Sequence, residues 1–136
     1  MGSWLGIDHG TKRIGIAVGS TATAVASPLG VIPAHPADAA RKRIVYFARE
    51  YQVKGIVVGL PLNMDGSEGR EAAAARRLAE GLEKAAGLQV RLFDERLSSF
   101  AADQALAGRL TRKKRRARQD ALAAATMLQD FLAAQK

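Results

Sequence analysis

The feature that most constrains the fold is a short, uninterrupted apolar run, GIVVG at positions 55–59. A strand that is apolar at every position must be covered on both faces, which is typical of a central strand in a parallel sheet. Segments with helical spacing of apolar residues stand on both sides of it, at about 38–51 and at about 68–86. The chain is therefore expected to form a sheet with helices packed against it.

Four further runs have the composition of strands. Residues 4–9 and 14–19 carry isoleucine or valine and are joined by GTKR, which predicts a β-hairpin. A third run at about 24–33 contains Pro28, and a proline at that place indicates an edge strand or a bend. Residues 89–94 alternate in polarity and form the last expected strand.

Capping and breaking residues indicate where the helices begin and end. Pro36 and Asp38 mark the start of the first helix. The second is expected to be capped by Ser67 and ended by Gly87. Two more helices are expected, from Ser98 or Ser99 to about Leu106 and from about Arg118 to Ala134. The resulting order, β-β-β-α-β-α-β-α-α, is that of a ribonuclease H-like α/β fold with a mixed five-stranded sheet. Nucleases, resolvases and actin-like or sugar-kinase ATPases share this topology, so it does not select a function.

The charge of the chain is concentrated in one segment. The 136 residues include 21 Lys and Arg against 13 Asp and Glu, a formal charge of +8. Seven of the basic residues fall within RLTRKKRRAR at 109–118, and no acid interrupts them. A solvated loop is one interpretation, but a dense block in an otherwise balanced domain favours contact with a polyanion, most commonly nucleic acid. A membrane surface is disfavoured because the block has no apolar face. The residues expected to contact nucleic acid are Arg112, Lys113, Lys114, Arg115, Arg116 and Arg118.

Composition excludes several classes of protein. The hydrophobic fraction of 48% supports a folded core, and no run of about 18 apolar residues is present to cross a membrane. The absence of cysteine excludes disulfides, thiolate zinc sites and cysteine nucleophiles. With no secretory signal at its start, the chain is expected to be cytoplasmic and to form a single domain over residues 1–136.

Three acidic residues stand where this topology can bring them together. Asp8 lies near the end of the first strand, and Glu95 follows the last strand. Asp120 is expected in the first turn of the final helix, on the apolar stripe that must face the sheet. Neighbouring carboxylates raise one another's pKa values, and a divalent cation removes that cost. Oxygen ligands without cysteine or paired histidine suit one or two Mg²⁺ or Mn²⁺ ions, which activate water for phosphodiester hydrolysis.

Each of these acids also has a structural alternative. Asp120 could interact with a helix dipole, and Asp8 could cap the hairpin turn. Glu95 could pair with Arg96 or with Arg91.

Other candidates carry a weaker signal. Asp65 belongs to an Asp-Gly pair that is ordinary in turns, and His9 is expected to point to the face opposite Asp8. Phosphate contacts are expected from residues in the hairpin turn and in the 60–69 loop, namely Lys12, Arg13 and Asn63.

Four segments together resemble the YqgF/RuvX family, whose members are described as Holliday-junction resolvases and as nucleases that mature the 5′ end of small-subunit ribosomal RNA. The segments follow the family's order over nearly the entire chain: LGIDHGTKRIGIAV at 5–18, VVGLPLNMDGSEG at 57–69, FDERLSS at 93–99 and RQDALAAATMLQDFL at 118–132. Each is weakly specific alone, and the match is strong because all four occur in register. Ser99 stands where the family usually has threonine.

The resemblance implies a metal-dependent endonuclease whose active-site acids, and Mg²⁺ or Mn²⁺ ligands, are Asp8, Glu95 and Asp120. The basic block, helped by Lys12, Arg13 and Arg96, would then follow the phosphate backbone. A four-way DNA junction and precursor ribosomal RNA both remain as substrates. A resolvase would act as a homodimer, because a junction has two-fold character, whereas an enzyme that trims ribosomal RNA could be monomeric.

Two other functions are compatible with parts of the sequence. GIDHGTKR is similar to the phosphate-binding hairpin of sugar kinases and actin-like ATPases, but those proteins clamp ATP between two such domains. A non-catalytic nucleic-acid- or ribosome-associated module would use the same acids for structure alone. Loss of cleavage without loss of binding in Asp8→Asn separates a nuclease from such a module.

Overall fold

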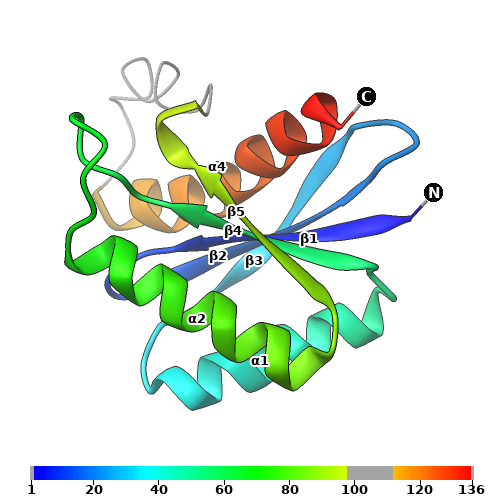
Figure 1. The fold of residues 1–136 in the computed structure, drawn as a ribbon, viewed down its shortest axis with the longest axis horizontal. Coiled ribbons are helices and arrows are strands. Elements are labelled where there is room, and N and C mark those ends of the chain that lie inside the picture. Colours follow the sequence, from blue (N-terminus) through cyan, green and yellow to red (C-terminus); the bar gives the residue numbers. More distant parts are fainter. Residues whose placement is uncertain (1, 98–111, 136) are drawn as a thin grey trace.

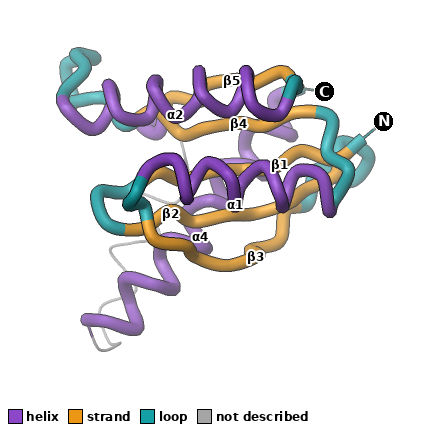
Figure 2. Tube along the Cα trace, turned by 90° about the horizontal axis from the view of Figure 1, so that it is seen from below, coloured by secondary structure: helices purple, strands orange, loops and turns teal. Residues whose placement is uncertain are grey.

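The computed structural model of the chain describes residues 2–97 and 112–135, and for 112–120 it describes the backbone only. Five strands form one sheet in the order β3-β2-β1-β4-β5 (Figure 1, Figure 2). β1, β2 and β3 pair antiparallel, whereas β4 is parallel to both β1 and β5. This is the mixed sheet that the sequence predicts. The strands are β1 Ser3–His9, β2 Arg13–Ser20, β3 Ala26–Pro33, β4 Gly55–Leu60 and β5 Gln89–Asp94.

Helices cover both faces of the sheet. Figure 1 shows α1 and α2 on one face and α4 across the other. Their bounds are α1 Ala37–Glu50, α2 Arg70–Ala86 and α4 Arg112–Ala134, and a single 3₁₀ turn, η1, spans Glu95–Leu97. Within the described ranges, no helix combines the length and the apolar character needed to span a bilayer.

The pleat of β1 divides its side chains between two hydrophobic cores. Leu5 and Ile7 are fully buried in the core beneath α1 and α2. Trp4 belongs to the core beneath α4, where its ring meets that of Phe131 edge-to-face at a centroid distance of 4.9 Å. Because side chains alternate along a strand, Asp8 faces α4 and His9 faces α1 and α2.

A glycine in β1 allows α4 to pack closely on the sheet. A Cβ atom at Gly6 would lie 2.8 Å from the Cβ of Leu128 and 3.2 Å from the carbonyl oxygen of Ala124. Any side chain at this position would push α4 away. The apolar stripe predicted for this helix is confirmed, since Ala124, Met127 and Phe131 are all buried against the sheet.

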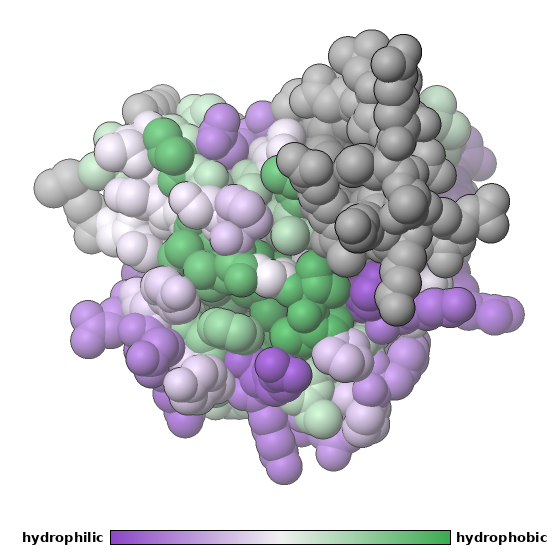
Figure 3. Space-filling model, turned by 180° about the vertical axis from the view of Figure 1, so that it is seen from behind, coloured by the Kyte–Doolittle hydropathy of each residue, from purple (hydrophilic) through white to green (hydrophobic). Residues whose placement is uncertain are grey.

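The edge position predicted for the strand that carries Pro28 is confirmed. Among the described strands β3 pairs only with β2, and the register between them shifts between Ile16 and Ala17. Figure 3 views the molecule from this edge, where apolar side chains gather at the centre and hydrophilic ones surround them.

Two predicted helix starts are wrong. The N-cap of α2 is Gly69, without a side-chain cap, and the hydroxyl oxygen of Ser67, two residues earlier, accepts from the amide of Asn63 instead of from a helix N–H. The final helix begins at Arg112 and not near Arg118, so most of the basic block is helical. Gly87 ends α2 in the left-handed conformation, with φ of 67°, as predicted. The helix expected from Ser98 or Ser99 lies outside the described residues.

Candidate active site

The carboxyl ends of three strands meet at one edge of the sheet, and two of the predicted acids stand there. β1, β4 and β5 are parallel neighbours. Asp8 is the penultimate residue of β1, the middle strand of the sheet, and Glu95 begins η1 directly after β5. The strand order therefore brings Asp8 and Glu95 to the same edge.

The two carboxyl groups form a hydrogen bond to each other. Burial raises the pKa of Glu95 to about 9, and the hydrogen bond to Asp8 and the charge of Asp8 act in the same direction. The negative charges of Glu71 and Asp94 contribute further. Glu95 consequently holds a proton at neutral pH and donates it to the carboxylate of Asp8. The pair is a half-buried, proton-sharing site of the kind that a divalent cation would satisfy by displacing the proton.

Glu95 reaches Asp8 by passing over β4 at Gly59, a contact that the sequence reasoning missed. A Cβ atom at Gly59 would collide with the carboxylate oxygen of Glu95 and would lie 3.1 Å from its Cδ and Cγ atoms. The missing side chain of Gly59 thus provides the space in which the glutamate lies. The available signal was the second glycine of GIVVGL, near the end of this strand. A glycine inside a strand often marks the close approach of another group.

Asp120 lies on α4, and its side chain is outside the described residues. Because α4 begins at Arg112, Asp120 stands about two turns into the helix and not in its first turn. The alternative of a helix-dipole contact is therefore wrong, since that effect is confined to the first turn. No group of three His, Asp or Glu residues suited to a metal occurs among the described side chains.

The alternative partners considered for Glu95 bind elsewhere. Arg96 forms an ion pair with Asp94, with a distance of 2.8 Å between Nη2 and Oδ2. The guanidinium of Arg91 lies over the ring of Trp4, 5.9 Å from its centroid. The carboxyl group of Glu95 instead forms its hydrogen bond with Asp8. The hairpin turn next to Asp8 is closed by a backbone hydrogen bond, in which the N–H of Gly10 donates to the carbonyl of Arg13 at 2.8 Å.

The loop between β4 and α2 is held in place by its own polar residues and by Arg96. Asp65 accepts hydrogen bonds from the N–H and the hydroxyl of Ser67, which lower the pKa of Asp65. The amide of Asn63 donates to the Ser67 hydroxyl at 3.0 Å. Arg96 also donates to the carbonyl of Met64 at 3.4 Å. Sequence reasoning did not foresee that Asp94 and Arg96 together would fasten this loop to the end of β5.

The predicted basic contacts are distributed around this edge. Lys12 lies in the β1–β2 turn, where its carbonyl accepts the N–H of Ala34 at 2.9 Å, and Arg13 begins β2. Arg112 to Arg118 form the first turns of α4, with side chains outside the described residues, and Arg109 is outside them entirely. His9 faces away from Asp8 as predicted, and burial lowers its pKa.

A mixed sheet with paired acids at the carboxyl ends of its central strands places the chain in the ribonuclease H-like fold class. Thermus thermophilus RuvC has the same fold: in its complex with a Holliday junction substrate the TM-score is 0.62 at 15% identity, covering 99% of this chain and 96% of that one. A second structure of T. thermophilus RuvC gives a TM-score of 0.60 at 17% identity, covering 98% and 95%.

The family is shown by sequence similarity. The model of the RuvX family, described as Holliday junction resolvase, matches residues 2–134, and the chain belongs to this family. A relative from Anaeromyxobacter sp. (strain Fw109-5) is 45% identical over 130 residues, which cover 95% of each chain. One from Chloroflexus aggregans is 41% identical over 133 residues, covering 97% of this chain and 94% of the relative. The names of both relatives propose a pre-16S rRNA nuclease.

Proposed function

We propose that this chain is a divalent-metal-dependent endonuclease that hydrolyses phosphodiester bonds in structured nucleic acid. The observation that carries the proposal is the proton-sharing pair of Asp8 and Glu95 at the carboxyl edge of the sheet. A half-buried pair of adjacent acids is unfavourable as two charges, and a cation with all-oxygen ligands removes that cost. The nuclease family and its names support the same reaction class.

Asp120 is proposed as the third acid, and the packing of α4 supports it. Trp4 contacts Phe131, and Gly6 is opposite Ala124 and Leu128, so α4 runs back toward the end of β1 as its residue numbers fall. From Gly6 to Asp8 a strand advances about 6.6 Å, and from Ala124 to Asp120 a helix advances about 6 Å. These two advances are similar, which supports the proposal that Asp120 stands near the level of Asp8 along the sheet.

The three acids would hold one or two Mg²⁺ or Mn²⁺ ions through their carboxylate oxygens. Such ions, when bound, supply charge neutralisation at the scissile phosphate and make the attacking water more acidic. Asp8 is placed by the central strand, and Glu95 loses its proton when it becomes a ligand. Gly59 keeps the path of Glu95 open.

Nucleic acid would approach this edge along the basic segment at the start of α4. That segment precedes Asp120 directly in the same helix, so phosphates bound to it lie beside the acids. Further contacts are proposed at the same edge. Arg96, which keeps Asp94 and Met64 as partners, would act partly by holding the loop in position. The additional contact residues are Lys12, Arg13, Asn63 and Arg96.

The test is a cleavage and binding panel in Mn²⁺ with a four-way DNA junction, duplex DNA and RNA that carries an immature 5′ leader. We expect wild-type protein to cleave the junction, the RNA or both, and Asp8→Asn to bind but not to cleave. Asp38→Asn, an exposed acid of α1, is the matched control and should retain cleavage. Cleavage that survives chelation, or that is unchanged in Asp8→Asn, contradicts the proposal. Sedimentation with and without junction shows whether a homodimer forms, as a junction substrate would require.

A further inference from the structure

A cavity of about 290 Å³ lies on the face of the sheet opposite Asp8, between the start of α1, the middle of α2 and the end of β1. Ile14 and Leu78 contribute to its apolar lining. Two histidines and two arginines supply its polar lining: His9, His35, Arg41 and Arg77. Neither the proposed nuclease reaction nor the resemblance to the RuvX family assigns a role to this cavity.

The charge in the cavity wall is unbalanced. No carboxylate lines it, and neither Arg41 nor Arg77 forms an ion pair within the described part of the chain. The contrast with neighbouring arginines is direct, since Arg76 is bound to Glu68 at 2.6 Å and Arg96 to Asp94 at 2.8 Å. Two unpaired guanidinium groups on one small cavity favour an anionic ligand.

The histidines add hydrogen-bonding groups to the same wall. His9 lines the cavity, although its Nδ1, which has no hydrogen-bond partner in the described structure, is itself enclosed by protein atoms. His35 is held by a hydrogen bond between its Nε2 and the carbonyl of Thr11, at 2.9 Å. Ala37, the first residue of α1, also lines the cavity, so the positive end of a 14-residue helix faces the same space.

A glycine positions one of the arginines. A Cβ atom at Gly81, inside α2, would lie 3.2 Å from Cδ and 3.7 Å from Nη1 of Arg41. Glycine is unfavourable within a helix, and here it allows the side chain of Arg41 to lie against α2.

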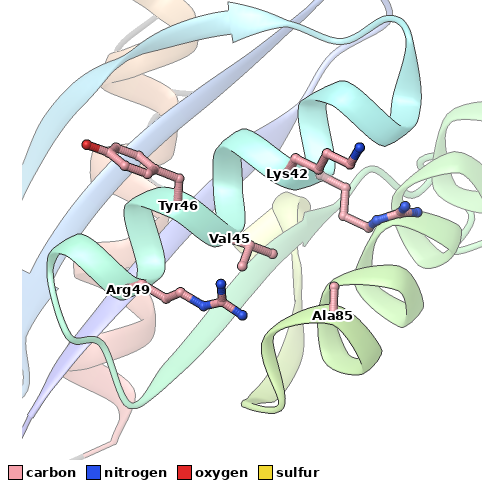
Figure 4. Close-up of a pocket in the computed structure, with 6 residues that line it drawn as sticks. Lys42, Val45, Tyr46, Arg49 and Ala85 are labelled. Atoms are coloured by element: carbon pink, nitrogen blue, oxygen red, sulfur yellow. The ribbon is translucent and has the colours of Figure 1, made fainter.

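Beyond Arg41 the same groove between α1 and α2 continues into a second cavity, of about 280 Å³. Figure 4 shows Val45 and Arg49 of α1 pointing toward Ala85 of α2 across it, whereas the ring of Tyr46 points away from α2. Arg49 therefore extends the row of basic side chains along this groove beyond Arg41.

We propose that the cavity lined by Arg41 and Arg77 binds the phosphoryl group of a nucleotide, with the sugar or base against its apolar lining. The two arginines are the charged donors, and the histidine rings and the start of α1 complete the site. The phosphoryl group belongs either to a free mononucleotide or to a nucleic-acid strand that continues along the groove toward Arg49. The site is separate from the acids, so it does not depend on the proposed cleavage reaction.

Calorimetric titration of the full chain in metal-free Tris buffer at low ionic strength tests this site without cleavage. The probes are inorganic phosphate, AMP, adenosine and a short oligoribonucleotide with a 5′-phosphate or a 5′-hydroxyl. We expect AMP to bind and adenosine not to bind. Arg41→Ala and Arg77→Ala should each weaken AMP binding about tenfold or more, because each removes a charge-assisted hydrogen bond. Gly81→Ala, which keeps both arginines but displaces Arg41, should weaken it as well.

Arg43→Ala is the matched control, since Arg43 is exposed on α1 and lines neither cavity. Tighter binding of the oligonucleotide than of AMP, with a loss in Arg49→Ala for the oligonucleotide alone, identifies a strand as the source of the phosphoryl group. Equal binding of both identifies the mononucleotide. Equal affinity for AMP and adenosine, no binding by any phosphate probe, or unchanged AMP affinity in Arg41→Ala and Arg77→Ala overturns the proposal.

Discussion

The carboxyl group of Glu95 lies over the backbone of Gly59, in the space that a side chain at that position would fill. Glu95 directly follows β5, and Asp8 is the penultimate residue of β1, so β4, the strand between them, must be crossed for the two acids to meet. The absence of a side chain at Gly59 is what permits the crossing. The site is therefore built from three strands, although only two of them contribute an acid.

Replacing Gly59 with alanine should separate the two acids. The added methyl group collides with the glutamate, and we expect cleavage to fall by about 100-fold, as for a misplaced catalytic group. Overpacking should also lower the free energy of unfolding by about 1–3 kcal/mol. Steady-state cleavage rates and urea denaturation measure the two effects. Gly2→Ala is the control, because a Cβ there meets only the flexible side chain of Lys54. Full activity in Gly59→Ala would show that Glu95 need not pass over β4.

The raised pKa of Glu95 predicts how the metal-free protein responds to pH. In the unfolded chain Glu95 loses its proton near pH 4.5, whereas in the folded protein it keeps it to about pH 9. The folded state therefore binds more protons between these values, and the free energy of unfolding should decrease as pH rises through this window. Thermal melts in chelator from pH 5 to pH 9 test this, and Glu95→Gln should flatten the slope. Glu83→Gln, an exposed acid of α2, should leave the slope unchanged.

Divalent cations should stabilise the folded protein through the same acids. A ligand that binds only the folded state adds about 2.7 kcal/mol at a concentration of 100 times its Kd. At pH 8 we expect Mn²⁺ or Mg²⁺ to raise the melting temperature of the wild type and to have little effect on Asp8→Asn. Asp38→Asn, with its exposed carboxylate lost, should respond as the wild type does. An equal shift in Asp8→Asn would place the ion elsewhere.

Loss of Arg96 should loosen the loop before α2 more than it destabilises the fold. The side chains of Arg96 and Asp94 are 39% and 23% exposed, so solvent screens their ion pair and it contributes little to stability. In Arg96→Ala we expect faster amide exchange around Met64 and Gly66, which the guanidinium contacts or approaches. Hydrogen exchange measured by mass spectrometry reports this, with Lys84→Ala as the control. Unchanged exchange in the loop would mean that Asp65 and Ser67 hold it without Arg96.

The strands could be predicted to within about two residues because their apolar patterns are local. The start of α4 could not be predicted, because a run of lysine and arginine is compatible with a charged loop and with a helix alike. Both residues have good helix propensity. Ser67 was expected to cap α2, but its hydroxyl oxygen accepts from the amide of Asn63, and the helix begins three residues later at Arg70. The proximity of Asp8 and Glu95 could be predicted from the strand order, because both acids stand at the carboxyl ends of parallel strands. The passage of Glu95 over β4 is a contact between distant segments that no local pattern records.

Gly6 should control how α4, and with it Asp120, sits on the sheet. In Gly6→Ala the new methyl group would lie 2.8 Å from the Cβ of Leu128, so the helix must shift outward. We expect a loss of about 1–3 kcal/mol in the free energy of unfolding and a change in the fluorescence of Trp4, whose ring contacts Phe131. Cleavage should fall with both Asp8 and Glu95 intact, because the third acid has moved. Gly2→Ala again serves as the control. If Gly6→Ala lost stability but cleaved at the wild-type rate, the position of α4 would not matter to the reaction, and Asp120 would have no place among the catalytic acids.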